Sequence, residues 1–257
     1  MQGIEDLRGV HAGSDVWVIG ASAALDFFPE AFFDERVTIG VNHVSELFPV
    51  KYIVSKADAE SSAGAVERMA RAHPETTFVV SRHEYGKLSR PEVEIPLMNV
   101  RVFSHRHNRS EAFSAASDIP VEEDHLLVSQ STFGSAMHFG AVLGARSLFL
   151  VGNDGGLLED RLYSRGYPRP SHRQPSTRPW SRFFRRKARI SEWDARVLEV
   201  SVRQSDEIGE SLGRMYGCSV VNVLPFPTLR LGGRKFASSY AAINDRADSS
   251  RGSRLLS

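Results

Sequence analysis

The stretch DVWVIG at residues 15–20, followed by ASAAL at 21–25, decides the fold class. Its short apolar run ends in a glycine and passes into small residues, which indicates a buried strand that turns into the start of a helix. The runs 37–42 and 52–55 repeat a brief β-branched segment that leads into polar residues. Such runs are typical of parallel strands covered on both faces. We therefore expect an α/β protein with a single Rossmann-like, doubly wound, mostly parallel sheet.

The rest of the chain alternates helical and strand patterns. Residues 130–146 have the clearest helical pattern, because Ser131 or Thr132 can cap the segment and its apolar face carries little bulk. Residues 81–124 hold three prolines and one clear apolar stretch, 100–103, so this region is predicted to be rich in loops. The other predicted helices are 61–73 and 190–216, and the other predicted strands are 76–80, 147–152 and 219–223.

The composition is that of an ordinary globular protein, with 41% hydrophobic and 25% charged residues among 257. We expect a single nucleotide-binding domain over 1–244 and a disordered tail over 245–257, where Ser, Asp and Arg dominate. A net charge of +1 gives no overall attraction to nucleic acid, so no specific nucleic-acid partner is expected.

Three features of the sequence bear on the compartment. The lone Cys218 cannot form an intramolecular disulfide, and residues 1–14 lack the apolar core of a signal peptide. No run reaches the roughly 18 apolar residues that a bilayer-spanning helix needs. A cytoplasmic protein is therefore expected, with peripheral contact at the inner membrane as a further option.

The segment 161–189 is strongly basic and irregular. It holds ten arginines and lysines, four prolines and no acidic residue. One interpretation is a lid-like insertion that closes over phosphates, and another is a solvated stretch that contacts anionic lipid or RNA without specificity. The aromatic residues Trp180, Phe183 and Phe184 would also suit docking at a membrane that holds a lipid-linked acceptor.

The turn at 20–25 offers backbone amides to a phosphate, because it leads into a predicted helix. It has one glycine where the dinucleotide-binding fingerprint G-x-G-x-x-G has three, and the chain has no G-x-x-x-x-G-K-[ST] loop. NAD-binding and P-loop functions are therefore disfavoured. A plain tight turn in a Rossmann-like sheet is the structural alternative.

Five short motifs carry a resemblance to a known group of enzymes. They are Gly20 with its small-residue turn up to Leu25, GVN at 40–42, SKAD at 55–58, STFGSA at 131–136 and LFLVGND at 148–154. Together they resemble bacterial CMP-sialic-acid-dependent sialyltransferases and the related hydroxymethylpterin pyrophosphokinase-like (MptE-like) family. Ser22, Ala23 and Ala24 stand where the turn of that family usually has Gly, Pro and Ser.

The resemblance implies a nucleotide site along these motifs. Asn42 would contact the base or ribose, and Ser131 and Thr132 would contact the nucleotide from a helix N-terminus. A turn residue at Asn42 and simple helix capping at Ser131 or Thr132 are the structural alternatives. The nucleotide-binding residues implied are Gly20, Ala21, Ser22, Asn42, Asp58, Ser131, Thr132 and Gly134.

An inverting transfer from a nucleotide sugar needs a base for the acceptor hydroxyl and groups that stabilise the leaving phosphate. The related sialyltransferases place tyrosines and a histidine base on a lid in this part of the chain. That makes His172 the candidate base, against the alternative of a solvated surface histidine. Asp154, at a predicted strand end, is the second candidate catalytic residue, because its carboxylate could bond a donor hydroxyl. The candidate phosphate ligands are Tyr163, Arg165, Tyr167, Arg169 and Arg173.

Three other histidines are candidates for a role in the site. His138 competes for the catalytic part, although a histidine inside a small-residue helix is more often a packing residue. His105 and His107 form an H-x-H pair, but no third ligand is nearby in sequence, so no metal site is expected there.

The expected function is that of an inverting, metal-independent glycosyltransferase of polysaccharide biosynthesis, without a cofactor. By the resemblance, its donor is a nucleotide sugar, CMP-linked, and its acceptor is a glycan or a lipid-linked glycan. One alternative is a pterin-type pyrophosphokinase, whose Mg²⁺ would need carboxylates such as Asp58 and Asp154. The other is a non-catalytic nucleotide-binding protein, in line with the altered turn after Gly20.

Overall fold

The computed structural model describes residues 2–56, 60–83, 92–105, 119–129, 131–153, 163–168, 192–223, 228–231 and 234–237. The strands are β1 (Gln2–Gly3), β2 (Asp15–Ile19), β3 (Val37–Val41), β4 (Tyr52–Ser55), β5 (Thr77–Ser81), β6 (Val100–Phe103), β7 (Ser147–Val151), β8 (Ser219–Val223), β9 (Thr228–Leu231) and β10 (Arg234–Ala237). The helices are η1 (Glu5–Leu7), η2 (Ala23–Phe27), η3 (Glu30–Phe33), η4 (Val44–Glu46), α1 (Glu60–Ala72), α3 (Thr132–Val142) and α4 (Glu192–Tyr216).

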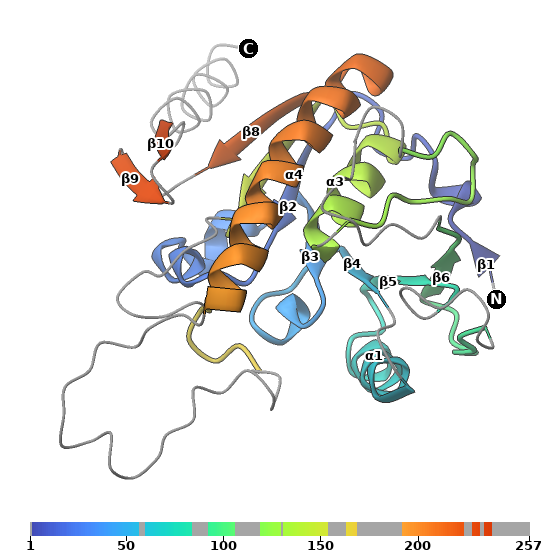
Figure 1. Ribbon diagram of the computed structural model, residues 1–257. Helices are drawn as coiled ribbons and strands as arrows, with labels where there is room; N and C mark the ends of the chain where they lie inside the picture. The colour runs from blue at the N-terminus through green and yellow to red at the C-terminus, as the bar shows by residue number, and fades with distance from the viewer. Residues whose placement is uncertain are drawn as a thin grey trace, which may run out of the picture.

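The centre of the fold is an eight-stranded sheet in the order β1-β6-β5-β4-β3-β2-β7-β8 (Figure 1). Every neighbouring pair in it is parallel, whereas β9 and β10 form a separate antiparallel pair. The predicted α/β class with one Rossmann-like, mostly parallel sheet is therefore confirmed.

The strand order reverses direction once. From β2 to β6 each strand is added on the same side of its predecessor, and the chain then returns through α3 to place β7 on the other side of β2. Because parallel crossovers are right-handed, a reversal of direction puts the later helices on the opposite face of the sheet. The pair β2 and β7 is thus the switch point, beside which open α/β sheets bind their ligands.

Packing confirms that the sheet is covered on both faces. A Cβ added to Gly140 of α3 would meet side chains of Leu148, Ile39 and Val16, so α3 lies closely against that face. All 11 residues of α3 are buried, and α4 lies beside α3 over the sheet (Figure 1). Small residues in α3 permit this close approach, as its sequence predicts.

The opposite face is covered by aromatic side chains. Trp17 of β2 stacks on Phe149 of β7 with ring centroids 4.6 Å apart. Phe32 and Phe33 of η3 meet the Trp17 ring edge-on at 5.1 and 6.5 Å. The connection from β2 to β3 therefore stabilises the fold through these rings rather than through a long helix.

Two parts of the prediction were wrong in detail. Residues 100–103 form β6 in the interior of the sheet, although they were predicted to lie in a region rich in loops. A four-residue apolar run among prolines is too short for its pattern to distinguish a strand from a loop.

The second error concerns the connection after β2. There the chain forms η2, a 3₁₀ helix of five residues, where an α-helix start was predicted. The tail at 245–257 and most of the 161–189 insertion lie outside the described residues.

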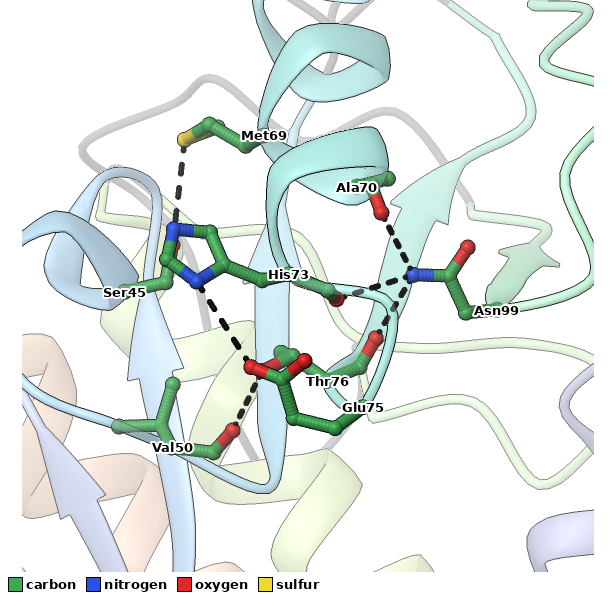
Figure 2. Close-up of polar contacts among 8 residues, drawn as sticks. All are labelled: Ser45, Val50, Met69, Ala70, His73, Glu75, Thr76 and Asn99. Carbon is green, nitrogen blue, oxygen red and sulfur yellow. Dashed lines mark hydrogen bonds and ion pairs between the residues drawn. The ribbon is translucent and has the colours of Figure 1, made fainter.

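The amino edge of the sheet is closed by side-chain contacts to backbone carbonyls (Figure 2). The amide nitrogen of Asn99 donates to the carbonyls of Ala70, His73 and Thr76 at 2.9, 3.2 and 3.1 Å. The Thr76 hydroxyl donates to the Val50 carbonyl at 2.8 Å. These contacts satisfy carbonyls at the end of α1, where helical partners run out. Polar groups at this edge are therefore used for structure.

Within the ranges given above, the structure contains no helix with both the length and the apolar character required to cross a membrane.

Candidate functional site

The ends of β2 and β7 touch through two glycines. The Gly20 amide donates to the Val151 carbonyl at 2.7 Å. A Cβ on Gly20 would lie 2.3 Å from the Gly152 carbonyl oxygen, and one on Gly152, at φ +71°, would lie 2.6 Å from the Gly20 oxygen. Both positions need glycine because the two backbones pass so closely. Packing of the switch point is thus enough to explain Gly20.

The turn after Gly20 is joined by a segment from much later in the chain. Ser22 forms an antiparallel bridge with Tyr163, and the Ser164 amide donates to the Ala21 carbonyl at 2.9 Å. Ser22 makes no side-chain cap of the short helix η2. Because η2 is a brief 3₁₀ helix, this turn does not lead into the α-helix from which a phosphate environment was expected.

Asp26 fixes the segment 163–168 at this place. Its Oδ1 accepts from the Ser164 hydroxyl at 2.6 Å and from the Arg165 amide at 2.9 Å. Its Oδ2 lies 3.7 Å from Nε of Arg165; the Asp26 side chain is 13% exposed and that of Arg165 is 77% exposed. Asp26 could not be predicted as a site residue from the sequence, since one aspartate in a turn carries no distinguishing pattern. Asp26 therefore holds the Arg165 backbone in place, while most of the Arg165 side chain is exposed to solvent.

The two predicted phosphate-binding tyrosines in this segment lie together. Tyr163 and Tyr167 stack with ring centroids 5.3 Å apart and planes 18° apart. His43, just beyond β3, meets Tyr167 edge-on at 6.2 Å and donates from Nδ1 to Glu46 at 2.7 Å. The rings thus lie beside the ends of β2 and β3, and both phenols belong to half-buried residues.

Asn42 occupies the turn that follows β3. Its backbone is left-handed, with φ +53°, a conformation that asparagine tolerates better than most residues. Its amide donates to the Val54 carbonyl at 3.0 Å, and its Oδ1 is 3.5 Å from the Ser55 hydroxyl. Asn42 therefore serves as a turn residue. Its half-buried carboxamide also lies at the carboxyl edge of the sheet, where it would have to be to contact a ligand.

The start of α3 faces the same edge. Ser131 caps the helix, because its hydroxyl accepts from the Phe133 amide at 3.1 Å. Ser129 donates from its hydroxyl to the Ser131 carbonyl at 3.0 Å. A Cβ on Gly134 would lie 2.5 Å from Oγ of Ser129, so this glycine is needed for packing. Thr132 is buried beside them. The capping prediction is confirmed, and a ligand role for the same residues stays a prediction.

Lys56 lies at this edge and was not among the predicted site residues. It follows β4 directly and is only 5% exposed. Its Nζ donates to the Ser129 carbonyl at 3.1 Å, which links the end of β4 to the start of α3. The signal in the sequence was a lysine placed immediately after the buried strand YIVS. Only the fold shows that its amine is enclosed.

His138 lies within α3 and is fully buried. Its Nδ1 accepts from the Leu127 amide at 3.0 Å, so the proton of the neutral ring is on Nε2, which donates to the Tyr216 hydroxyl at 2.9 Å. Burial, with a smaller effect of the nearby Arg8 charge, lowers the pKa of His138 from 6.5 to about 3. His138 is therefore a neutral packing residue, as the structural alternative predicted.

No family model, curated protein or solved structure matches this chain.

Several predicted site residues lie outside the described residues. They are Asp58, Asp154, Arg169, His172 and Arg173. The structure describes the turn after β7 as far as Asn153. In the parts of the chain described, no group of three or more His, Cys, Asp and Glu side chains is arranged to hold a metal.

The site residues that the structure describes gather at the carboxyl edge of β2, β3, β4 and β7, with the start of α3 beside them. They offer hydroxyl, carboxamide, amine and phenol groups, all of which can donate hydrogen bonds to phosphate and sugar oxygens. We call this the switch-point site. Its described members are Ala21, Ser22, Asn42, Lys56, Ser131, Thr132, Tyr163 and Tyr167.

Proposed function

We propose that the chain binds a nucleotide-activated sugar at the switch-point site and transfers the sugar to a glycan acceptor. The observation that carries this proposal is the reversal of strand order between β2 and β7. Loops leave such a pair toward opposite faces, so a crevice opens at their carboxyl ends, where nucleotides bind in this class of fold. In this chain, polar side chains from four separate segments lie at that edge of the sheet.

The placement of the donor follows from the groups available. The phosphate is expected near Tyr163 and Tyr167, whose phenols can donate to its oxygens, with the Arg165 guanidinium at the rim. The nucleoside is expected over Asn42 and the start of α3, where a carboxamide and hydroxyls can bond a base or ribose. The CMP-linked donor is taken from the resemblance alone.

The transfer step is proposed as a single inverting displacement. The acceptor oxygen forms a bond to the anomeric carbon while that carbon's bond to the phosphate oxygen breaks, and the acceptor proton passes to His172. The leaving CMP carries the electron pair of the broken bond, and hydrogen bonds from the tyrosines stabilise its phosphate. His172→Ala should then abolish release of CMP from the donor, and full turnover by this variant would remove His172 as the base.

A thermal-unfolding screen tests the ligand class. The chain is heated with CMP, CDP, UDP, GDP or ATP, each with and without Mg²⁺. We expect CMP to stabilise the chain without metal, by about 2.7 kcal/mol at 100 times its Kd. Stabilisation by ATP only with Mg²⁺ would favour the pyrophosphokinase instead. If no nucleotide raised the melting temperature, the proposal would be overturned.

A matched pair of variants tests the location. Asn42 and Glu35 have positive φ, +53° and +59°, and stand at opposite ends of β3. Glycine accepts that backbone, so Asn42→Gly removes the side chain without strain and Glu35→Gly is its control. We expect Asn42→Gly to weaken CMP binding about tenfold, as loss of a polar contact does, and Glu35→Gly to leave it unchanged. Equal binding by both variants would remove Asn42 from the site.

A further inference from the structure

His43 lies at the carboxyl edge of the sheet, and the proposed function does not yet use it. It follows Asn42, the first residue after β3, and its ring meets that of Tyr167 edge-on with centroids 6.2 Å apart. Asn42 is the expected contact of the nucleoside, and Tyr167 is an expected contact of the phosphate. The ribose joins the base to the phosphate, so a nucleotide bound to both residues would have its ribose beside His43.

The turn that begins at His43 is fixed on the sheet. The Glu46 amide donates to the His43 carbonyl at 3.0 Å and so closes the 3₁₀ helix η4. Val44 and Ser45 within it are buried, and a Cβ added to Gly40 of β3 would lie 3.0 Å from Cβ of Val44. Side chains three residues apart in a 3₁₀ turn stand one above the other. The turn therefore brings the side chains of His43 and Glu46 together.

The contact with Glu46 decides which nitrogen of the His43 ring is available. Nδ1 donates to Oε1 of Glu46 at 2.7 Å. A carboxylate only accepts, so the neutral ring has its proton on Nδ1 and its lone pair on Nε2. Within the described residues this is the only hydrogen bond of the His43 ring, whose side chain is 33% exposed. Nε2 is therefore left as an acceptor for a hydrogen-bond donor of a ligand.

An acceptor at this place selects one part of a nucleotide. The phosphate oxygens of a nucleotide sugar only accept hydrogen bonds, whereas the ribose hydroxyls can donate them. The amine of cytosine also donates, but it lies on the edge of the base farthest from the ribose. In dinucleotide-binding sheets an acceptor about 20 residues after the glycine turn takes a ribose hydroxyl, and His43 has a comparable spacing from Gly20. The ribose is thus the part that suits Nε2.

We infer that Nε2 of His43 accepts a hydrogen bond from a ribose hydroxyl of the bound nucleotide and makes the site selective for ribonucleotides over deoxyribonucleotides. Glu46 is a positioning residue, because it fixes the tautomer and the orientation of the ring. The inference rests on the proposed function, since it takes the nucleotide to span Asn42 and Tyr167. A deoxynucleotide leaves the lone pair of Nε2 without its donor, and a site built to bond a hydroxyl binds such an analogue less tightly.

Deoxynucleotide binding to the wild-type chain tests the inference first. CMP, 2′-deoxy-CMP and 3′-deoxy-CMP are titrated separately by isothermal titration calorimetry. We expect at least one deoxynucleotide to bind about tenfold more weakly than CMP, as loss of one hydrogen bond does, and the weaker ligand identifies the hydroxyl. Equal affinity for all three ligands would overturn the inference.

Variants then assign the selectivity to the His43–Glu46 pair. His43→Phe keeps a ring beside Tyr167 and removes both nitrogens, so the ratio of CMP affinity to deoxynucleotide affinity should fall to about one. Glu46→Gln places an amide there that can donate as well as accept, so the tautomer is no longer fixed and the ratio should fall part of the way. Selectivity of wild-type size in His43→Phe would overturn the inference, and in Glu46→Gln it would overturn the role of Glu46.

His73 and Glu75 provide matched controls (Figure 2). They form a second histidine–carboxylate pair, with Nδ1 3.8 Å from Oε1 and the His73 side chain 31% exposed, but they follow α1 at the amino edge. We expect His73→Phe and Glu75→Gln to keep the wild-type ratio. Because the readout is a ratio of two affinities of one variant, a change in basal stability does not enter it. Loss of selectivity in the controls as well would overturn the assignment to His43.

The same titrations separate this inference from the proposed function. A chain that binds CMP and both deoxynucleotides equally well keeps the proposed function and loses the inference. A chain that binds none of the nucleotides in the thermal screen loses the proposed function, and the inference falls with it. Selectivity for CMP that disappears only in the variants of His43 and Glu46 supports both.

Discussion

Position 20 requires glycine because the backbone of Gly152 passes so close to it. A Cβ at Gly20 would lie 2.3 Å from the Gly152 carbonyl oxygen, and backbone at that distance has to shift. We expect Gly20→Ala to lower the free energy of unfolding by about 2 kcal/mol or more, as overpacking does. The control is Gly64→Ala in α1, where the nearest atom is 3.7 Å away and alanine should add about 0.5–1 kcal/mol. Equal stability of the two variants in urea unfolding would contradict the close approach of β2 and β7.

His138 gives the molecule a defined response to acid. The unfolded chain binds this proton with a pKa of 6.5, while the folded chain binds it only at about 3. Unfolding therefore takes up a proton between these values, and stability falls as pH drops below about 6.5, by about 1.4 kcal/mol for each pH unit. We expect His138→Asn to flatten that slope when the free energy of unfolding is measured from pH 7 to pH 5. Identical slopes in wild type and variant would show that His138 titrates normally.

At the residue scale, sequence patterns predicted the cap and the packing histidine but missed the buried lysine. Ser131 and His138 lie in a helix with a clear periodic pattern, so their local roles follow from position. The enclosure of Lys56 depends on Ser129, which arrives from a distant part of the chain. Asp26 was missed for the same reason, since its partners Ser164 and Arg165 come from far along the sequence.

The end of α1 depends on one carboxamide. Asn99 donates to three carbonyls around the helix end (Figure 2). We expect Asn99→Ala to cost about 1–2 kcal/mol of stability, and Asn99→Asp to cost more, because a carboxylate would face three carbonyl oxygens. Urea unfolding measures both variants. An aspartate variant as stable as the wild type would show that the donor contacts do not hold α1.

At the element scale, the long helices and most strands of the sheet were predictable from the sequence, whereas β6 and the 3₁₀ helices were not. α3 and α4 have enough turns for their periodicity to be read. β6 is a short strand in a region that holds three prolines, so its assignment requires the pairing with β5, which the sequence alone does not show. The connection after β2 was predicted as a helix start, yet aromatic packing onto Trp17 holds it as short 3₁₀ turns.

At the scale of the whole molecule, alternating strand and helix patterns predicted a parallel, doubly wound sheet but not the order of its strands. The reversal between β2 and β7 arises because the chain returns through α3 to the other side of β2. Sequence patterns do not show on which side of the sheet such a strand is added. The docking of residues 163–168 against the turn after β2 was likewise unpredictable, because it rests on contacts with Asp26. The grouping of Ser22, Asn42 and Ser131 at one edge followed from their positions at strand ends and a helix start.

The most direct test of the switch-point site is an NMR titration of the ¹⁵N-labelled chain with CMP, followed through backbone amide shifts. We predict that the amides of Ala21, Ser22 and Asn42 and those at the start of α3 move together with a single saturating dependence on CMP. The amides of His73 and Asn99 at the amino edge should stay in place. Shifts confined to the amino edge, or no shifts at the highest CMP concentration reached, would contradict the account.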